Sequence, residues 1–126
     1  MSNFTRFNHK SLINPNYQDS EQYIPLKDIP FKKSAELYAI NPEMTYSIRA
    51  MYRSTSDYGD QIVAIVNAES EPDSLFRMAL PRKYTEIINV DDAGLIADCN
   101  QGLARFAITE YHSKRFNKEL NDIKFL

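Results

Sequence analysis

The stretch "HSKRFNKE", residues 112–119, holds three cations around one aromatic ring. Lys114, Arg115 and Lys118 can neutralise phosphate groups, and Phe116 offers a flat surface on which a base can stack. This combination holds single-stranded nucleic acid without base-specific hydrogen bonds. A loop that only turns the chain needs none of these side chains. Two roles stay open for Phe116, which are stacking on a ligand and folding back over its own domain.

Four arginines on expected strands extend this candidate surface. In "TYSIRAMYR", every second residue from position 46 to position 52 is expected to face the core, which leaves Arg49 and Arg53 outward. Arg77 in "LFRMAL" and Arg105 in "LARFAITEY" have the same outward position. The net charge is −2, but acidic residues concentrate in "ESEPD" and "VDDAGLIAD", so one positive face remains compatible with it. Exposed arginines also serve solubility and the protection of sheet edges, and that alternative stays open.

Aromatic residues of the expected strands and turns can serve either in base stacking or in core packing. Tyr58 lies in the turn "STSDYGD" and could supply a second stacking ring. Tyr46 and Tyr52 alternate in step with Ile48, so packing in the core is the expected role of both.

Catalytic chemistry finds little support in the spacing of the reactive residues. His9 and His112 lie apart from any cluster with metal-ligand spacing, and Cys99 is expected to be a buried residue of a helix. Asp91 and Asp92 are adjacent, so on a helix they would point about 100° apart. The glycines are isolated, which excludes a glycine-rich phosphate loop. We therefore expect neither an enzyme nor a cofactor nor a bound metal, with an unrecognised nuclease as the remaining catalytic possibility.

The elements that must position these residues follow from periodicity and turn signals. Residues 1–30 are rich in Asn, Gln, Ser and Pro and form an expected N-terminal arm, whose aromatic residues suggest docking or self-association. Residues 31–126 form the expected domain. It begins with a short helix in "FKKSAELYAI", where Phe31 and Tyr38 share a face, and continues with three strands ending in "LFRMAL". A helical connection in two pieces, capped by Gly102, then precedes two strands that flank "HSKRFNKE".

Five strands with a helix between the third and the fourth are the elements of an OB-fold, a small five-stranded barrel whose loops commonly bind oligonucleotides. An α+β sheet with helices on one side is the main alternative. At 126 residues with 43% hydrophobic content, the chain has the composition of one soluble domain. It shows neither a membrane span nor a signal peptide, so we expect a cytoplasmic protein.

The layout of "YSIRAMYRSTSDYG", "LFRMALP" and "GLARFAITEYHSKRFNKELNDIKF" resembles the small OB-fold single-stranded DNA-binding proteins of Gram-positive phages and conjugative elements. The resemblance covers roughly residues 31–126. It implies DNA contact by Tyr58, Tyr111, Lys114, Arg115 and Phe116, with the outward arginines in support. The chain departs from many single-strand binders in having no Trp, and it lacks the acidic, Pro-rich tail by which bacterial housekeeping binders recruit partners.

The expected function is therefore binding of single-stranded DNA without strong sequence preference, in replication or transfer of a mobile genetic element. RNA as the ligand stays open, because a 2′-hydroxyl contact leaves no trace in the sequence. The alternative is a protein-binding module, such as a phage-encoded inhibitor or adaptor of a host enzyme, because one fold hosts many functions. The predicted DNA-binding residues are Arg49, Arg53, Tyr58, Arg77, Arg105, Tyr111, Lys114, Arg115, Phe116 and Lys118.

Overall fold

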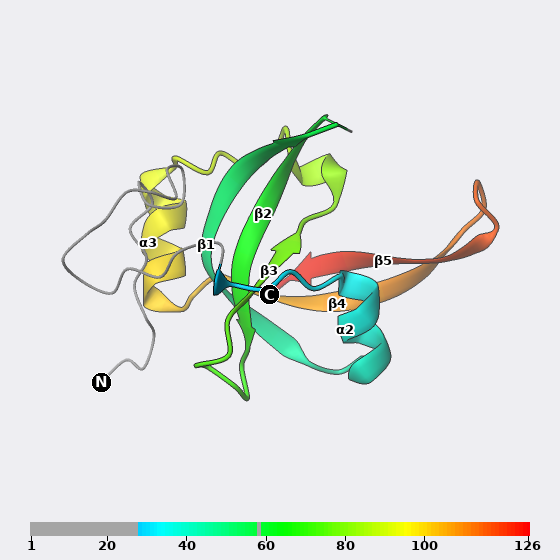
Figure 1. Cartoon of the computed structure of the whole chain (residues 1–126), viewed down its shortest axis with the longest axis horizontal. Coiled ribbons are helices and arrows are strands. Elements are labelled where there is room, and N and C mark those ends of the chain that lie inside the picture. The colour runs from blue at the N-terminus through cyan, green and yellow to red at the C-terminus, as the bar shows by residue number, and fades with distance from the viewer. Residues whose placement is uncertain (1–27, 58) are drawn as a thin grey trace.

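The computed structural model describes residues 28–57 and 59–126. In chain order its elements are α2 (Ser34–Ile40), β1 (Thr45–Ser56), β2 (Gly59–Ala68), β3 (Phe76–Ala79), the 3-10 helix η2 (Arg82–Tyr84), α3 (Ala93–Gln101), β4 (Arg105–Ser113) and β5 (Lys118–Phe125). The five strands form one antiparallel sheet in the order β3-β2-β1-β4-β5. The sheet curls strongly into a half-barrel (Figure 1). The predicted mainly β, OB-like architecture with a helix between β3 and β4 is confirmed.

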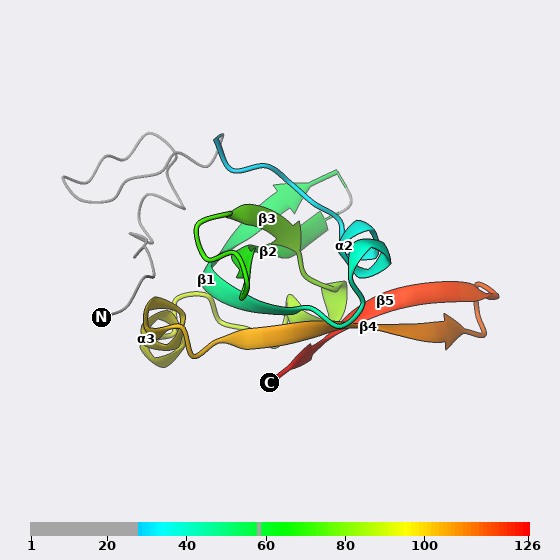
Figure 2. The same cartoon turned by 90° about the horizontal axis from the view of Figure 1, so that it is seen from below.

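The two sheet edges, β3 and β5, are separated by α2 and the segment before it (Figure 2). Residues 30–32 run parallel to β3, where the amide of Lys32 donates to the carbonyl of Arg77 at 2.9 Å and the amide of Arg77 donates to Pro30 at 2.7 Å. The helix that follows packs against β4 and β5 and buries Leu37 in the core. The outer edge of β3 is thus partly covered, which protects backbone groups that an open edge would expose.

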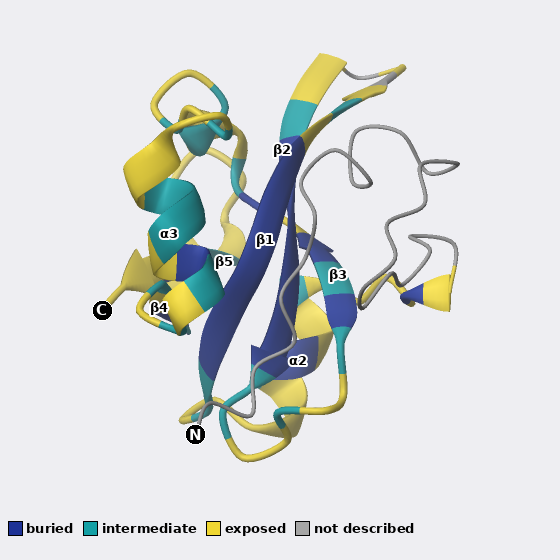
Figure 3. Ribbon diagram, turned by 90° about the vertical axis from the view of Figure 1, so that its left-hand side faces the viewer, coloured by how far each residue is buried: buried dark blue, intermediate teal, exposed yellow. Residues whose placement is uncertain are grey.

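Both faces of the central strands are buried. Residues 62–66 of β2 are all inaccessible, so this apolar run is covered on both sides (Figure 3). The inner face holds a cluster in which Tyr46 stacks on Phe106 at 5.3 Å between ring centres. The outer face holds a second, smaller cluster in which Ile29 packs against the strands. Residues 28–30, assigned to the arm from the sequence, therefore include a buried residue of this domain.

An irregularity of the β-bulge type at Arg49 divides β1 into two halves of opposite orientation. Ile48 pairs with Val66 and Ala50 pairs with Ile65, so Arg49 is the extra residue between them. Such an insertion reverses the alternation that follows it. The predicted single face for positions 46–52 is therefore wrong beyond the bulge: Met51 joins the inner cluster, while Ala50 lies in the outer one.

The helical segments follow the predicted capping signals in part. The connection between β3 and β4 contains two pieces as predicted, and the side chain of Asp92 caps α3 by accepting a hydrogen bond from the amide of Leu95 at 2.9 Å. Gly102 ends α3 with φ of 74°, which confirms the predicted C-cap. The helix expected to include Phe31 begins only at Ser34, because residues 30–32 pair with β3 instead. Within the described ranges, no helix has both the length and the hydropathy required to cross a bilayer.

Candidate nucleic-acid interface

The β4–β5 hairpin projects from the half-barrel and carries the basic stretch at its end (Figure 1). Its last cross-strand pair is Ser113 with Lys118, so residues 114–117 make the turn. Asn117 has φ of 49°, in the left-handed region that Asn tolerates, and the Ser113 hydroxyl accepts a hydrogen bond from the amide of Phe116 at 3.3 Å. The prediction that "HSKRFNKE" joins two strands is confirmed.

The turn presents an aromatic ring between cations. Phe116 is 57% exposed, so it does not fold back over the domain. The guanidinium carbon of Arg115 lies 5.2 Å from the ring centre and the ammonium of Lys118 lies 6.0 Å from it. Both distances fall within the range of cation–π attraction, which holds the charges beside the ring. Lys114 is exposed in the same turn. A base stacked on Phe116 would therefore bring its phosphates close to these cations.

The two faces of the hairpin differ in chemistry. Tyr111 pairs with Leu120 and Ser113 pairs with Lys118, and because these two pairs are separated by one intervening pair, Tyr111 and Lys118 lie on the same face. Tyr111 is 48% exposed. The intervening pair, His112 and Glu119, lies on the opposite face, with its side chains 2.7 Å apart. One face of the hairpin thus offers an aromatic ring and a cation, and the acidic residue nearest the turn is on the other.

A basic cavity of about 370 Å³ lies between the end of the β1–β2 ladder and η2. It is lined by Arg53, Asp60, Arg82, Lys83, Thr85 and Glu86. Arg53 donates a hydrogen bond to the carbonyl of Thr85 and lies 3.9 Å from the Asp60 carboxylate. Arg53 pairs with Ile62, an inner-cluster residue, so its exposed side chain leaves the sheet from the inner face at this end.

The cavity is linked to the base of the hairpin through Lys83. Its ammonium forms an ion pair with Asp122 of β5. The pKa of Lys83 is raised, first by this hydrogen bond and further by the nearby Tyr84 and Tyr111. Arg82 and Lys83 are not among the predicted binding residues, because the sequence "PRK" at residues 81–83 is typical of a helix start. Their contribution depends on how η2 packs against β1 and β5.

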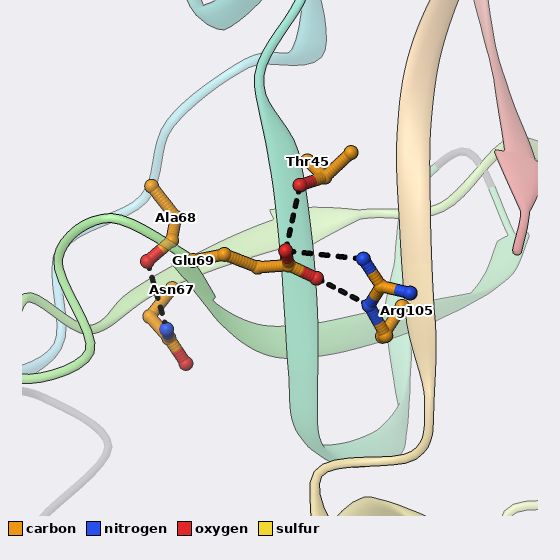
Figure 4. A network of polar contacts seen from close by, with 5 residues as sticks. All are labelled: Thr45, Asn67, Ala68, Glu69 and Arg105. Atoms are coloured by element: carbon orange, nitrogen blue, oxygen red, sulfur yellow. Dashed lines mark hydrogen bonds and ion pairs between the residues drawn. The ribbon is translucent and has the colours of Figure 1, made fainter.

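Two of the predicted arginines lie on the outer face and already have partners. The Nε of Arg77 donates to the carbonyl of Ile29 at 2.9 Å. Arg105 forms a bidentate ion pair with Glu69, whose carboxylate also accepts a hydrogen bond from Thr45 at 2.8 Å (Figure 4). The hydrogen bond from Arg105 lowers the pKa of Glu69, and the same contact raises the pKa of Arg105. These arginines connect neighbouring elements. Arg105 pairs with Ser47 and Arg77 pairs with Ile65, so neither arginine belongs to the hairpin turn.

The prediction that Arg49 faces outward is wrong. The residue is 1% exposed, and its Nη1 donates to Asn67 Oδ1 and to the carbonyl of Pro72, both at 3.3 Å. Burial lowers the pKa of the guanidinium to about 10, although the charge of Asp73 acts in the opposite direction. The extra residue at the bulge explains the error, because strict alternation does not apply there.

The remaining predicted residues separate into two groups. Tyr111, Lys114, Arg115, Phe116 and Lys118 come together on the hairpin, while Tyr58 lies outside the described residues. Cys99 is buried as predicted, and burial raises the pKa of its thiol to about 11. In the described part of the chain, no group of three or more His, Cys, Asp or Glu residues is arranged to hold a metal ion.

No protein family, curated protein or solved structure gives a significant match to the chain. The arrangement of strands is consistent with an OB-like fold, and the case for a function depends on the residues themselves.

Proposed function

We propose that the chain binds single-stranded DNA without strong sequence preference and acts in replication or transfer of a mobile genetic element. The observation that carries this proposal is the exposed Phe116 ring, flanked by Arg115 and Lys118, at the end of a projecting hairpin. A stacked ring and exposed cations recognise features that every nucleotide shares, namely a π-face and a phosphate. The site is therefore suited to tracking a strand and not to reading its sequence.

The proposed path begins at the hairpin turn and continues toward the basic cavity. Tyr111 lies on the face of the hairpin that carries Lys118, and Lys83 pairs with Asp122, whose cross-strand partner Thr109 is two residues before Tyr111 on β4. A strand stacked on Phe116 and then on Tyr111 would bring later phosphates toward Lys83 and Arg82. This path uses neither the buried Arg49 nor the outer-face Arg105.

The alternative, a protein-binding module acting on a host enzyme, has support in the exposed acidic turn between β2 and β3, which contains Glu71 and Asp73. Acidic surfaces of this kind can attract basic partners. The two proposals place the functional residues on different parts of the molecule. Charge reversal in the hairpin should abolish DNA binding, and under the alternative it should leave partner binding largely intact.

The test is fluorescence anisotropy of a labelled oligo-dT of about 30 nucleotides titrated with the full chain at two salt concentrations. Duplex DNA and oligo-U serve as competitors and separate single-strand preference from RNA preference. Binding that weakens steeply with salt, and from which excess duplex DNA does not displace the labelled strand, supports the proposal. No binding even at low salt contradicts it and directs the search to a protein partner.

A further inference from the structure

Phe31 is a second exposed aromatic ring with a cation against it. The residue is 55% exposed although it lies beside the buried outer cluster. The guanidinium carbon of Arg77 lies 4.3 Å from its ring centre, and the Nε of Arg77 is held by the carbonyl of Ile29. One side of the ring is therefore occupied by a fixed positive group. This arrangement repeats, on a different element, the pairing of Arg115 with Phe116.

Two lysines follow Phe31 directly and lie at the edge of a hollow. The hollow has a volume of about 460 Å³ and is lined by Phe31, Lys32, Lys33, Ser34, Glu36 and Ala79. Both lysines are exposed, and the ammonium of Lys32 lies 5.0 Å from the centre of the Phe76 ring. Glu36 is the single acidic residue of this lining. The hollow thus combines an apolar wall with an excess of positive charge, which suits a base and its phosphate.

The backbone that carries these side chains is fixed in place. Residues 30–32 pair with β3, and Ile29 is 2% exposed in the outer cluster. Phe31 is therefore held at the edge of the sheet with more than half of its surface exposed. Fixed rings lose less conformational entropy on binding than rings on mobile loops.

The position of this surface suits a strand that also contacts the hairpin. α2 begins at Ser34, immediately after Lys33, and packs against β4 and β5. Its seven residues correspond to a length of roughly 10 Å. A single helix of this length therefore connects the hollow to the two strands that support the hairpin (Figure 2).

We infer that Phe31, Lys32 and Lys33, with Arg77 behind the ring, form a second nucleotide-binding surface for the same single strand. This inference rests on the proposed function and adds the prediction that the bound strand has two anchor points. The hairpin alone holds a short oligonucleotide, and the surface at Phe31 engages only when the strand is long enough to pass α2. Linked contacts of this kind strengthen binding through effective concentration.

The test compares oligo-dT of two lengths, about 8 and about 30 nucleotides, by anisotropy. The variant Phe31→Ala/Lys33→Glu should lose affinity for the longer strand by about tenfold or more and change affinity for the shorter strand by less than about twofold. Ile40→Ala and Lys124→Glu are matched controls, since both residues are exposed and lie outside the hollow. Phe31→Tyr keeps a ring and should retain long-strand affinity, which separates stacking from any disturbance of the backbone.

The results distinguish a failure of the second surface at Phe31 from a failure of the proposed DNA binding itself. Wild-type affinity of Phe31→Ala/Lys33→Glu for the longer strand overturns the second surface and leaves the hairpin proposal standing. Equal losses for both lengths also overturn it, because the surface would then not depend on strand length. Failure of the wild-type chain to bind either oligonucleotide overturns both proposals.

Discussion

The guanidinium carbon of Arg115 lies 5.2 Å from the centre of the Phe116 ring at the turn of the β4–β5 hairpin. The contact keeps a positive charge beside an exposed aromatic surface. Both side chains are exposed, so neither is part of the buried core. Phosphate attraction and base stacking can then act on the same nucleotide.

Phe116→Ala should weaken binding of oligo-dT by about 1–3 kcal/mol, because the stacking surface is removed. The ring is 57% exposed, so the free energy of unfolding should change by no more than about 0.5 kcal/mol. Anisotropy titration and urea denaturation measure the two quantities. Ile87→Ala is the control, since Ile87 is 73% exposed and lies in the connection between η2 and α3, outside the hairpin turn. An equal loss of affinity in both variants would argue against a specific role for the ring.

Arg115→Ala should reduce the salt dependence of binding. Each phosphate contact to a single strand contributes about 0.7 to the slope of log K against log salt, so losing one contact should reduce the slope by about that amount. The measurement is a titration series over several salt concentrations. Lys124→Ala, on β5 outside the turn, should leave the slope unchanged. An unchanged slope for Arg115→Ala would remove this residue from the path.

Arg49→Ala should lower the free energy of unfolding by about 2–4 kcal/mol, because it leaves the buried amide of Asn67 without this donor and creates a void. Chemical denaturation measures the loss. Below the unfolding transition, the variant should bind oligo-dT with nearly wild-type affinity, since the side chain does not reach the surface. A stable variant with greatly reduced binding would contradict this assignment.

Glu69→Gln should lower stability at neutral pH but not in acid. The hydrogen bond from Arg105 lowers the pKa of Glu69 below its ordinary value, so the folded state favours the ionised carboxylate. The resulting stabilisation is present above the unfolded pKa and is lost as the pH falls through the folded pKa. For a partly exposed pair we expect a small difference at pH 7 that disappears once the pH has fallen below the lowered pKa of Glu69. Thermal unfolding of both proteins across this range would show the convergence, and a constant difference would contradict it.

The strands were predictable because their apolar residues repeat with a period that few other structures produce. The run containing Ile62 and Val66 is continuous and β-branched, and it forms a strand covered on both sides. The turn before the last strand was equally clear, since polar residues separate two apolar runs. For these elements, local sequence and tertiary packing favour the same structure.

The errors arise where tertiary pairing decides between local alternatives. No glycine or proline marks the extra residue at Arg49, so alternation predicted an outward arginine where the fold has a buried one. Pro30 is compatible with a helix start, but the backbone of residues 30–32 pairs with β3 instead. Arg82 and Arg53 are far apart in the sequence, and their shared cavity depends on the curl of the sheet. Such relationships require the register and the curvature, which periodicity does not determine.

The affinity of Lys114→Glu/Arg115→Glu for labelled oligo-dT is the sharpest test of strand binding at the hairpin turn, with Lys124→Glu as the control for charge reversal on the same hairpin. Both sites are exposed, so the variants should keep the melting temperature of the wild-type chain. Wild type and Lys124→Glu should bind at low salt, whereas Lys114→Glu/Arg115→Glu should lose affinity by about a hundredfold or more. Wild-type affinity of a folded Lys114→Glu/Arg115→Glu protein would contradict the claim that the hairpin turn holds the strand.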